Sequence, residues 1–128
     1  MFDKYLIVDG TLRNTGPVDA PDGFAFDAKL GYYRGLGLSM VEELNIAIDD
    51  EAVDRTAVRF DEGMGPIGLD AMATAYDRRW PFGQAATILV TRPGGFPKGT
   101  HTLSLQQKLR VSYLPFPSFN NDRKTVSL

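Results

Sequence analysis

The sequence predicts an all-β protein: an antiparallel β-sandwich of about seven or eight strands with little helix. Three observations predict this class: apolar and polar side chains alternate with a period of two in several runs, turn-forming residues separate these runs, and helical periodicity is scarce. The chain has 128 residues, the length of one domain, so we expect a single β-sandwich domain over residues 1–128. A chain of this length can bury about two-thirds of its unfolded surface, enough for one hydrophobic core.

The clearest strand is expected from His101 to Tyr113, with the sequence HTLSLQQKLRVSY. Its odd-numbered positions are mostly apolar and its even-numbered positions are polar, so one face should be buried. At about 3.3 Å per residue such a strand would reach about 40 Å, which is long for a small domain. We therefore expect either a bulge at Gln107 or a strand that serves two sheets.

Six shorter runs complete the predicted strands. The run Phe24–Leu30 places apolar side chains on one side, and Ala85–Thr91 is an apolar run typical of a central sandwich strand. Helix is expected only as one or two turns within Gly68–Tyr76, with Asp70 as the N-cap. The other four strands are expected at Tyr5–Val8, Leu44–Ile48, Ala57–Phe60 and Lys124–Leu128, and turns at Gly16-Pro17, Pro21–Gly23, Asp49-Asp50, Asp61–Gly63, Pro93–Gly95 and Lys98-Gly99.

The charge of the chain argues against nucleic acid as a partner, because the net charge is -2 and the pI is about 5.3. Residues up to Met64 hold 13 acidic and 6 basic side chains, whereas those from Gly65 onward hold 3 and 8, a weak indication of an electrostatically steered protein partner. The lack of cysteine excludes disulfides and thiolate metal sites. No signal peptide and no membrane-spanning run is visible, so we expect a cytoplasmic protein without a membrane partner.

Side chains suited to catalysis are few. His101 is the one histidine, and its place on the inward face of the long predicted strand favours a structural role. The acidic group from Asp49 to Asp54 lacks the spacing of a calcium loop and is expected to be a solvated hairpin turn. GLGLSM at 35–40 begins like a dinucleotide-binding motif but lacks its third glycine. A pair of catalytic carboxylates, as in glycosidases, stays open because spacing in the sequence does not determine distance in space.

Three segments rich in aromatic residues are the candidates for binding: GYYRGLGLSM at 31–40, RRWPFG at 78–83 and YLPFPSF at 113–119. Tyr, Trp and Arg dominate binding hot spots, and Pro and Gly hold such loops in defined shapes. Two other interpretations stay open: one in which the aromatic rings cap the open ends of the sandwich, and one in which Trp80 or Tyr32 stacks on a sugar. The candidate partner-binding or pocket-wall residues are Tyr32, Tyr33, Arg34, Arg79, Trp80, Phe82, Tyr113 and Phe116.

Five blocks of the chain resemble, in order and spacing, the β subunit of bacterial C-glycoside deglycosidases. The resemblance covers nearly the whole chain and matches least over residues 48–75. The blocks are FDKYLIV, GYYRGLGLSMVEEL, RRWPFGQAATILVTRPGG, LRVSYLPFPS and the terminal DRKTVSL.

The resemblance implies a complex of a larger α subunit and a small β subunit. The α subunit would resemble sugar isomerase/epimerase barrels and hold a divalent metal ion, expected to be manganese. Such enzymes cleave the carbon–carbon bond between a sugar in its 3-keto form and an aromatic aglycone such as a flavone. The ketone acidifies the proton at C2, a base removes it, the metal stabilises the enolate, and the aglycone leaves from C1. This β-elimination would make the complex a lyase.

The residues of this chain fit the small subunit, because one histidine and no ligand-like cluster cannot supply that chemistry. We expect no catalytic residue, no metal ligand and no cofactor in this chain. It would stabilise the α subunit, complete the wall of the aglycone pocket, and form αβ pairs assembled into a higher oligomer. GYYRGLGLSM would be a docking segment, in which flanking glycines hold Tyr32, Tyr33 and Arg34 against the partner. The alternatives are a stand-alone carbohydrate-binding module and a generic immunoglobulin-like structural domain.

Overall fold

The computed structural model describes residues 6–8, 10–17, 19–30, 35–81, 83–95, 99–110 and 118–127. Strands account for 52% of this part and helical segments for 10%, and no helix reaches seven residues. The all-β prediction is therefore confirmed. No helix of these ranges has the length and the apolar character needed to cross a membrane.

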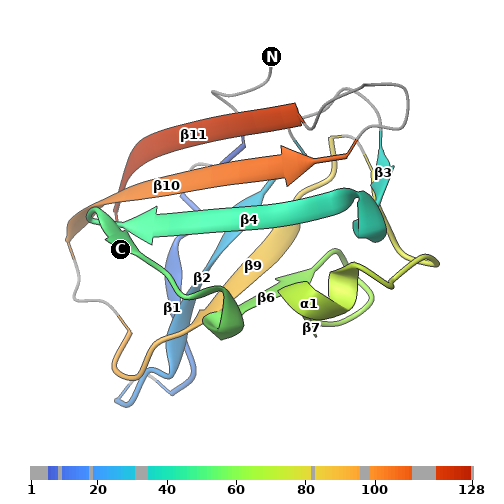
Figure 1. Cartoon of the computed structure of the whole chain (residues 1–128). Coiled ribbons are helices and arrows are strands. Elements are labelled where there is room, and N and C mark those ends of the chain that lie inside the picture. The colour runs from blue at the N-terminus through green and yellow to red at the C-terminus, as the bar shows by residue number, and fades with distance from the viewer. Residues whose placement is uncertain are drawn as a thin grey trace.

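Two antiparallel sheets form the body of the protein. Figure 1 shows β4 and β10 of one sheet crossing in front of β2 and β9 of the other, so that the sheets make two layers with their strands running across each other. The five-stranded sheet has the order β1 (Arg13–Thr15), β2 (Gly23–Ala28), β9 (Ala86–Thr91), β6 (Val58–Asp61) and β7 (Ile67–Gly68). The four-stranded sheet has the order β11 (Ser118–Ser127), β10 (Thr100–Leu109), β4 (Val41–Ile48) and β5 (Glu51–Ala52).

A third, two-stranded sheet pairs β3 (Leu36–Gly37) with β8 (Arg79–Trp80). The described part thus holds eleven strands against the seven or eight predicted. The difference comes from strands of two or three residues, which are too short to show an alternating pattern.

Strand β10 confirms the alternation expected from His101 onward. Its odd-numbered side chains are buried and its even-numbered ones are not. The strand lies between β4 and β11 in one sheet, so the alternative of a strand serving two sheets is wrong for this part. Its pairing with β4 becomes irregular between Lys108 and Leu109, one residue after the expected bulge at Gln107, which itself pairs regularly with Leu44. Residues 111–113 of the predicted strand lie outside the described residues.

The shorter predicted strands are found with shifted ends. Strand β9 lies centrally between β2 and β6, as its apolar run predicted, and β4 begins three residues before the expected Leu44. At the N-terminus Ile7 makes an isolated bridge to Ala28 in place of a full strand. Strand β11 begins at Ser118, six residues before the expected Lys124, because its polar start has no apolar alternation.

The helical prediction needs a correction at its cap. Helix α1 (Leu69–Met72) has Gly68 as its N-cap, without a side-chain hydrogen bond. Asp70 is therefore not the cap but lies in the first turn, where its Oδ1 accepts a hydrogen bond from Arg55 Nη2 at 2.7 Å. The two other helical segments within the described residues are 3-10 turns, η2 (Leu38–Met40) and η3 (Arg55–Ala57).

The buried side chains of both sheets form one hydrophobic cluster. Its largest fully buried members are Trp80, Phe24, Phe26 and Phe60. The rings of Phe60 and Trp80 meet edge to face with centroids 4.9 Å apart, which joins β8 to β6.

Candidate partner-binding site

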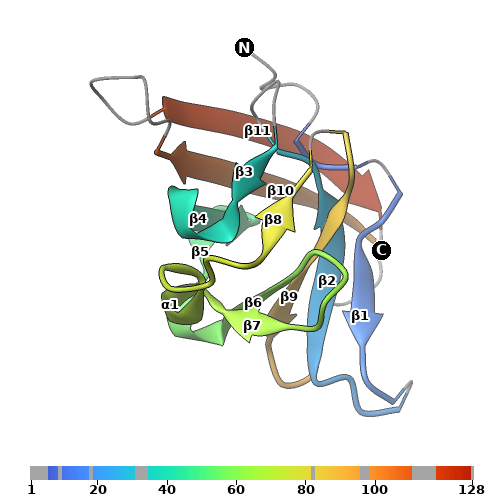
Figure 2. The ribbon, with the colours of Figure 1, turned by 90° about the vertical axis from the view of Figure 1, so that its right-hand side faces the viewer.

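Two of the three aromatic segments meet in the β3–β8 ribbon, which Figure 2 shows from the front. Leu36 pairs with Trp80 and Gly37 with Arg79. The backbone N–H of Leu38 donates to the Arg78 carbonyl at 2.9 Å, and Arg79 Nη2 donates to the Gly35 carbonyl at 3.1 Å. Residues 35–38 of the first segment and 78–80 of the second therefore lie side by side, although some forty residues separate them.

The described residues on either side of 111–117 lie close together. The described chain stops at Arg110, whose backbone N–H donates to the Met40 carbonyl at 2.7 Å, and resumes at Ser118, which pairs with Leu109. Arg110 Nη2 also lies 3.2 Å from Glu42 Oε2. The described parts of the three segments thus lie at one end of the sheets. We call this region the β3–β8 end and define it by Gly35–Met40, Arg78–Pro81, Arg110 and Ser118–Phe119.

The structure describes two of the eight candidate residues, both in β8. Arg79 is exposed, as expected of a contact residue. Trp80 has 0% exposure, and its Nε1 donates to the Gln84 carbonyl at 2.9 Å. The interpretation of Trp80 as a surface platform for a partner or a sugar therefore needs correction, since its ring belongs to the core. The other six candidates, Tyr32, Tyr33, Arg34, Phe82, Tyr113 and Phe116, lie outside the described residues.

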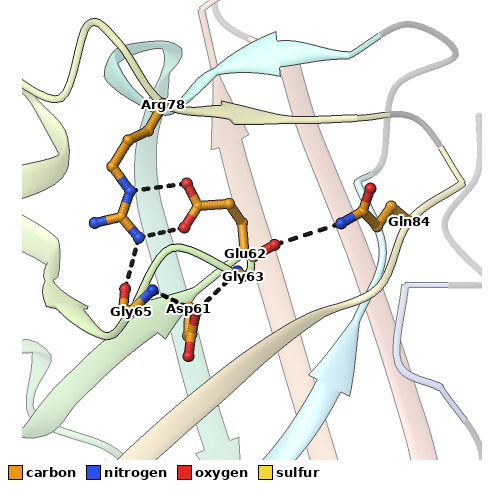
Figure 3. A network of polar contacts seen from close by, with 6 residues as sticks. All are labelled: Asp61, Glu62, Gly63, Gly65, Arg78 and Gln84. Carbon is orange, nitrogen blue, oxygen red and sulfur yellow. Dashed lines mark hydrogen bonds and ion pairs between the residues drawn. The ribbon is translucent and has the colours of Figure 1, made fainter.

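A buried ion pair fixes the start of β8, and sequence analysis did not find it (Figure 3). Arg78 Nε donates to Glu62 Oε2 at 2.8 Å, Arg78 Nη2 contacts the other carboxylate oxygen, and Nη2 also donates to the Gly65 carbonyl at 2.6 Å. Glu62 is 7% exposed. The hydrogen bonds from Arg78 hold the pKa of Glu62 below its usual value, against the effect of burial.

Hydrogen bonds also stabilise the loop that contains Glu62. Asp61 Oδ1 accepts the backbone N–H groups of Gly63 and Gly65 at 2.8 and 3.1 Å, and both glycines have positive φ angles of 127° and 108°. Gln84 Nε2 donates to the Glu62 carbonyl at 3.4 Å, as Figure 3 shows. The sequence signal for this loop was the turn predicted at Asp61–Gly63. The pairing of Glu62 with Arg78, sixteen residues later, could not be predicted from the spacing of residues in the sequence.

His101 also has a structural partner. Its side chain is 7% exposed, and Nδ1 lies 2.7 Å from Asp49 Oδ2. Asp49 Oδ1 accepts the Thr102 backbone N–H at 2.9 Å, and the hydrogen bond with His101 is the main cause that lowers the pKa of Asp49. Asp49 and Asp50 form the two-residue turn between β4 and β5, both with positive φ, as in a type I′ hairpin. The solvated hairpin turn predicted there is confirmed.

The pKa values of four carboxyl groups, Glu43, Asp49, Asp54 and Glu62, are lowered, the largest cause in each case being a hydrogen bond. These four groups are therefore unlike the general acid of a glycosidase pair, whose pKa is raised. Within the described ranges no three His, Cys, Asp or Glu side chains come close enough to hold a metal ion.

A cleft of about 360 Å³ adjoins the β3–β8 end. Tyr76 at its edge is 77% exposed, which makes it a contact candidate that sequence analysis placed only within the expected helix. Two ion pairs border it, Arg55 with Asp70 and Arg110 with Glu42. Its lining comes from Ser39, Met40, Val41, Glu42, Arg55, Leu69, Asp70, Ala73, Tyr76 and Arg110.

Comparison with known proteins identifies the family. A family model described as C-glycoside deglycosidase beta subunit matches residues 2–113. The chain belongs to this family. It is 31% identical over 116 residues to the 3'-dehydrocarminate deglycosidase beta subunit of a Microbacterium species, which covers 90% of this chain and 83% of that relative. It is 27% identical over 93 residues to the C-glycoside deglycosidase beta subunit of Eubacterium cellulosolvens, covering 73% of this chain and 63% of that protein.

Membership of this β-subunit family confirms the resemblance found in the sequence and implies a partner subunit in a heteromeric complex. The matched range includes both strands of the β3–β8 ribbon. A protein that needs a partner must present a surface to it, and the β3–β8 end is one surface that the segments singled out in the sequence share.

Proposed function

We propose that this β subunit breaks no bond itself and acts by docking onto a larger α subunit through the β3–β8 end. In the proposed complex the α subunit is a barrel resembling sugar isomerases and holds a divalent metal ion, expected to be manganese. The β subunit stabilises it and helps to close the pocket for the aglycone. The observation that supports this most is that the described parts of the three segments, Gly35–Met40, Arg78–Pro81 and Ser118–Phe119, lie at one end of the sheets.

The chemistry of the described side chains supports a non-catalytic role. Proton abstraction next to a ketone needs a free base. The Glu62 carboxylate is paired with Arg78, and the His101 ring is buried against Asp49. Neither group is poised to exchange protons with a substrate.

The proposed substrate is a 3-oxo-C-glycoside, for example of a flavonoid, and the proposed reaction is a β-elimination that releases the aglycone. The metal ion of the α subunit would supply charge stabilisation for the enolate. The part of this chain would be to exclude water and to offer an aromatic and arginine-bearing wall. Tyr32, Tyr33, Arg34, Phe82, Tyr113 and Phe116 remain the predicted wall residues.

Co-expression with a candidate α subunit, a protein that resembles sugar isomerase barrels, tests the proposal. We expect the two proteins to co-purify, and we expect a 3-oxo-C-glycoside to be cleaved by the complex but by neither subunit alone. Turnover by this chain alone would overturn the non-catalytic role. Separation of the two proteins under gentle conditions would overturn the docking role.

A further inference from the structure

The outward face of the four-stranded sheet carries mainly short or uncharged polar side chains. Its members alternate along each strand with buried residues such as Ile46 and Leu105, so they point away from the core. The register brings Ser104 next to Ala47 and Gln106 next to Asn45. We call this surface the outer face and define it by Asn45, Ala47, Ala52, Ser104, Gln106, Asn121 and Arg123.

The outer face is hollowed. An open depression of about 480 Å³ lies over it, lined mainly by apolar atoms. Ala47, Ala52 and Ser104 have short side chains, which leave this space open above the sheet. An open depression leaves a small ligand largely in water, whereas it can receive apolar side chains that project from a second protein surface.

The charged side chains of this face and its edges are compensated within the chain. Lys108 Nζ lies 3.3 Å from Glu43 Oε2 at one end, and Arg123 Nη2 lies 2.9 Å from Asp50 Oδ1 towards the other. These cations and carboxylates are paired within the chain. A partner that covers the face therefore meets little uncompensated charge.

The polar side chains at the centre already bond to one another. Asn45 Nδ2 donates to Gln106 Oε1 at 3.0 Å and to Glu43 Oε1 at 3.1 Å. A polar group that keeps its hydrogen bond loses little free energy when water is removed, whereas an unpaired group loses about 1–3 kcal/mol. The hydrogen bond between Asn45 and Gln106 can therefore persist when a partner covers the face.

The outer face is continuous with the β3–β8 end. Phe119, which belongs to that end, is 53% exposed and pairs across the strands with Lys108, whose Nζ lies 5.9 Å from its ring centroid. Strands β10 and β11 have ten residues each, so four strands cover on the order of 500 Å². A standard interface buries about 800 Å² per partner, so an interface of that size centred on the outer face would extend onto the adjoining β3–β8 end.

We propose that the outer face is the main docking site for the larger subunit of the deglycosidase. The larger subunit inserts apolar side chains into the hollow over Ala47, Ala52 and Ser104. This inference rests on the proposed docking function and adds the surface on which docking occurs. The contact at the β3–β8 end then forms the edge of one continuous interface.

Arginine substitutions test whether the outer face is the docking site. Ala47→Arg and Ser104→Arg fill the hollow from outward positions and leave the core untouched. We expect each to weaken binding of the purified larger subunit at least about tenfold in biolayer interferometry. Ala20→Arg is the matched control, since Ala20 is exposed in the connection between β1 and β2 of the other sheet. Unchanged affinity of the two folded variants would refute the outer face as the docking site and leave the proposed docking function intact.

A cysteine probe keeps the test decisive if arginine disturbs folding. The chain has no cysteine, so Ser104→Cys and Ala20→Cys each provide one thiol with little change in shape. We expect saturating larger subunit to slow alkylation of Cys at position 104 at least about tenfold and not at position 20. Equal alkylation rates at position 104 with and without the larger subunit would refute the proposed docking site. Slowing by a glycoside alone, or a stable dimer of this chain that Ala47→Arg dissociates, would show a different occupant and refute it too.

Discussion

Replacement of Arg78 by methionine removes the cation from the most buried ion pair that the structure describes. The Arg78 side chain is 11% exposed and that of Glu62 is 5% exposed. Loss of one partner of a buried pair costs about 3–5 kcal/mol, because the other charge stays buried without compensation. Since Arg78 keeps some contact with water, we expect the lower end, about 3 kcal/mol, for Arg78→Met. In a chain of 128 residues this lowers Tm by about 10 °C.

The pH dependence of this loss has a definite sign. The pKa of Glu62 is lowered in the folded protein, chiefly by the hydrogen bonds from Arg78. The stability contributed by the pair is therefore fully present above the unfolded pKa of about 4.3 and is lost as the pH falls through the folded pKa. The difference in free energy of unfolding between wild type and Arg78→Met should shrink on acidification from pH 7 to pH 3.

Urea unfolding followed by tryptophan fluorescence measures this difference, because Trp80 is the single tryptophan and lies two residues from Arg78. Arg79→Met is the matched control: Arg79 is exposed, so its loss should cost less than about 0.5 kcal/mol. A cost below about 1 kcal/mol for Arg78→Met, or a cost that stays constant with pH, would refute the description of this pair as a buried contact that stabilises the fold.

Three further changes test other parts of the structure. Trp80→Ala should destabilise the fold by about 3–5 kcal/mol in urea unfolding, since the ring is buried against Phe60; a cost of under 1 kcal/mol would contradict its place in the core. Gly23→Ala should cost about 3 kcal/mol or more, because a Cβ there would collide with the Val90 carbonyl oxygen and separate β2 from β9; a wild-type Tm would disprove this. Asp49→Asn should reduce the loss of Tm between pH 5 and pH 2, because the lowered pKa of Asp49 gives stability that disappears as the pH falls through the folded value; an unchanged slope would show that its contact with His101 is unimportant.

The sequence predicted the long elements of this fold and missed the short ones for a physical reason. Burial on one face imposes alternation, and β10 and β9 are long enough to show it. Strands such as β3 and β8 hold two residues each, so only tertiary pairing defines them. Strand β11 is polar along much of its length because it lies at the edge of its sheet, where one face and one side meet water.

The sequence offered candidate residue types for the site but not the direction in which their side chains point. Arg79 is exposed, whereas Trp80, the next residue, turns inward because alternate side chains of a strand point to opposite faces. The outer face was not predictable as a site, since Ala47 and Ser104 are individually unremarkable. They form a hollow only because the register places them side by side.

The neighbours of Arg79 explain why an exposed arginine at this place suits docking. Arg78 is tied to Glu62 on one side of it, and Trp80 is packed against Phe60 on the other. Strand β8 is therefore anchored at both of its ends, and the hydrogen bond of Arg79 to the Gly35 carbonyl further restricts the side chain. A side chain ordered before binding has less conformational entropy to lose when a partner arrives, and each immobilised side chain otherwise costs about 0.5–1.5 kcal/mol. The buried pair and the buried indole thus contribute to docking without touching the partner, because they keep the β3–β8 end in the shape that the partner would bind.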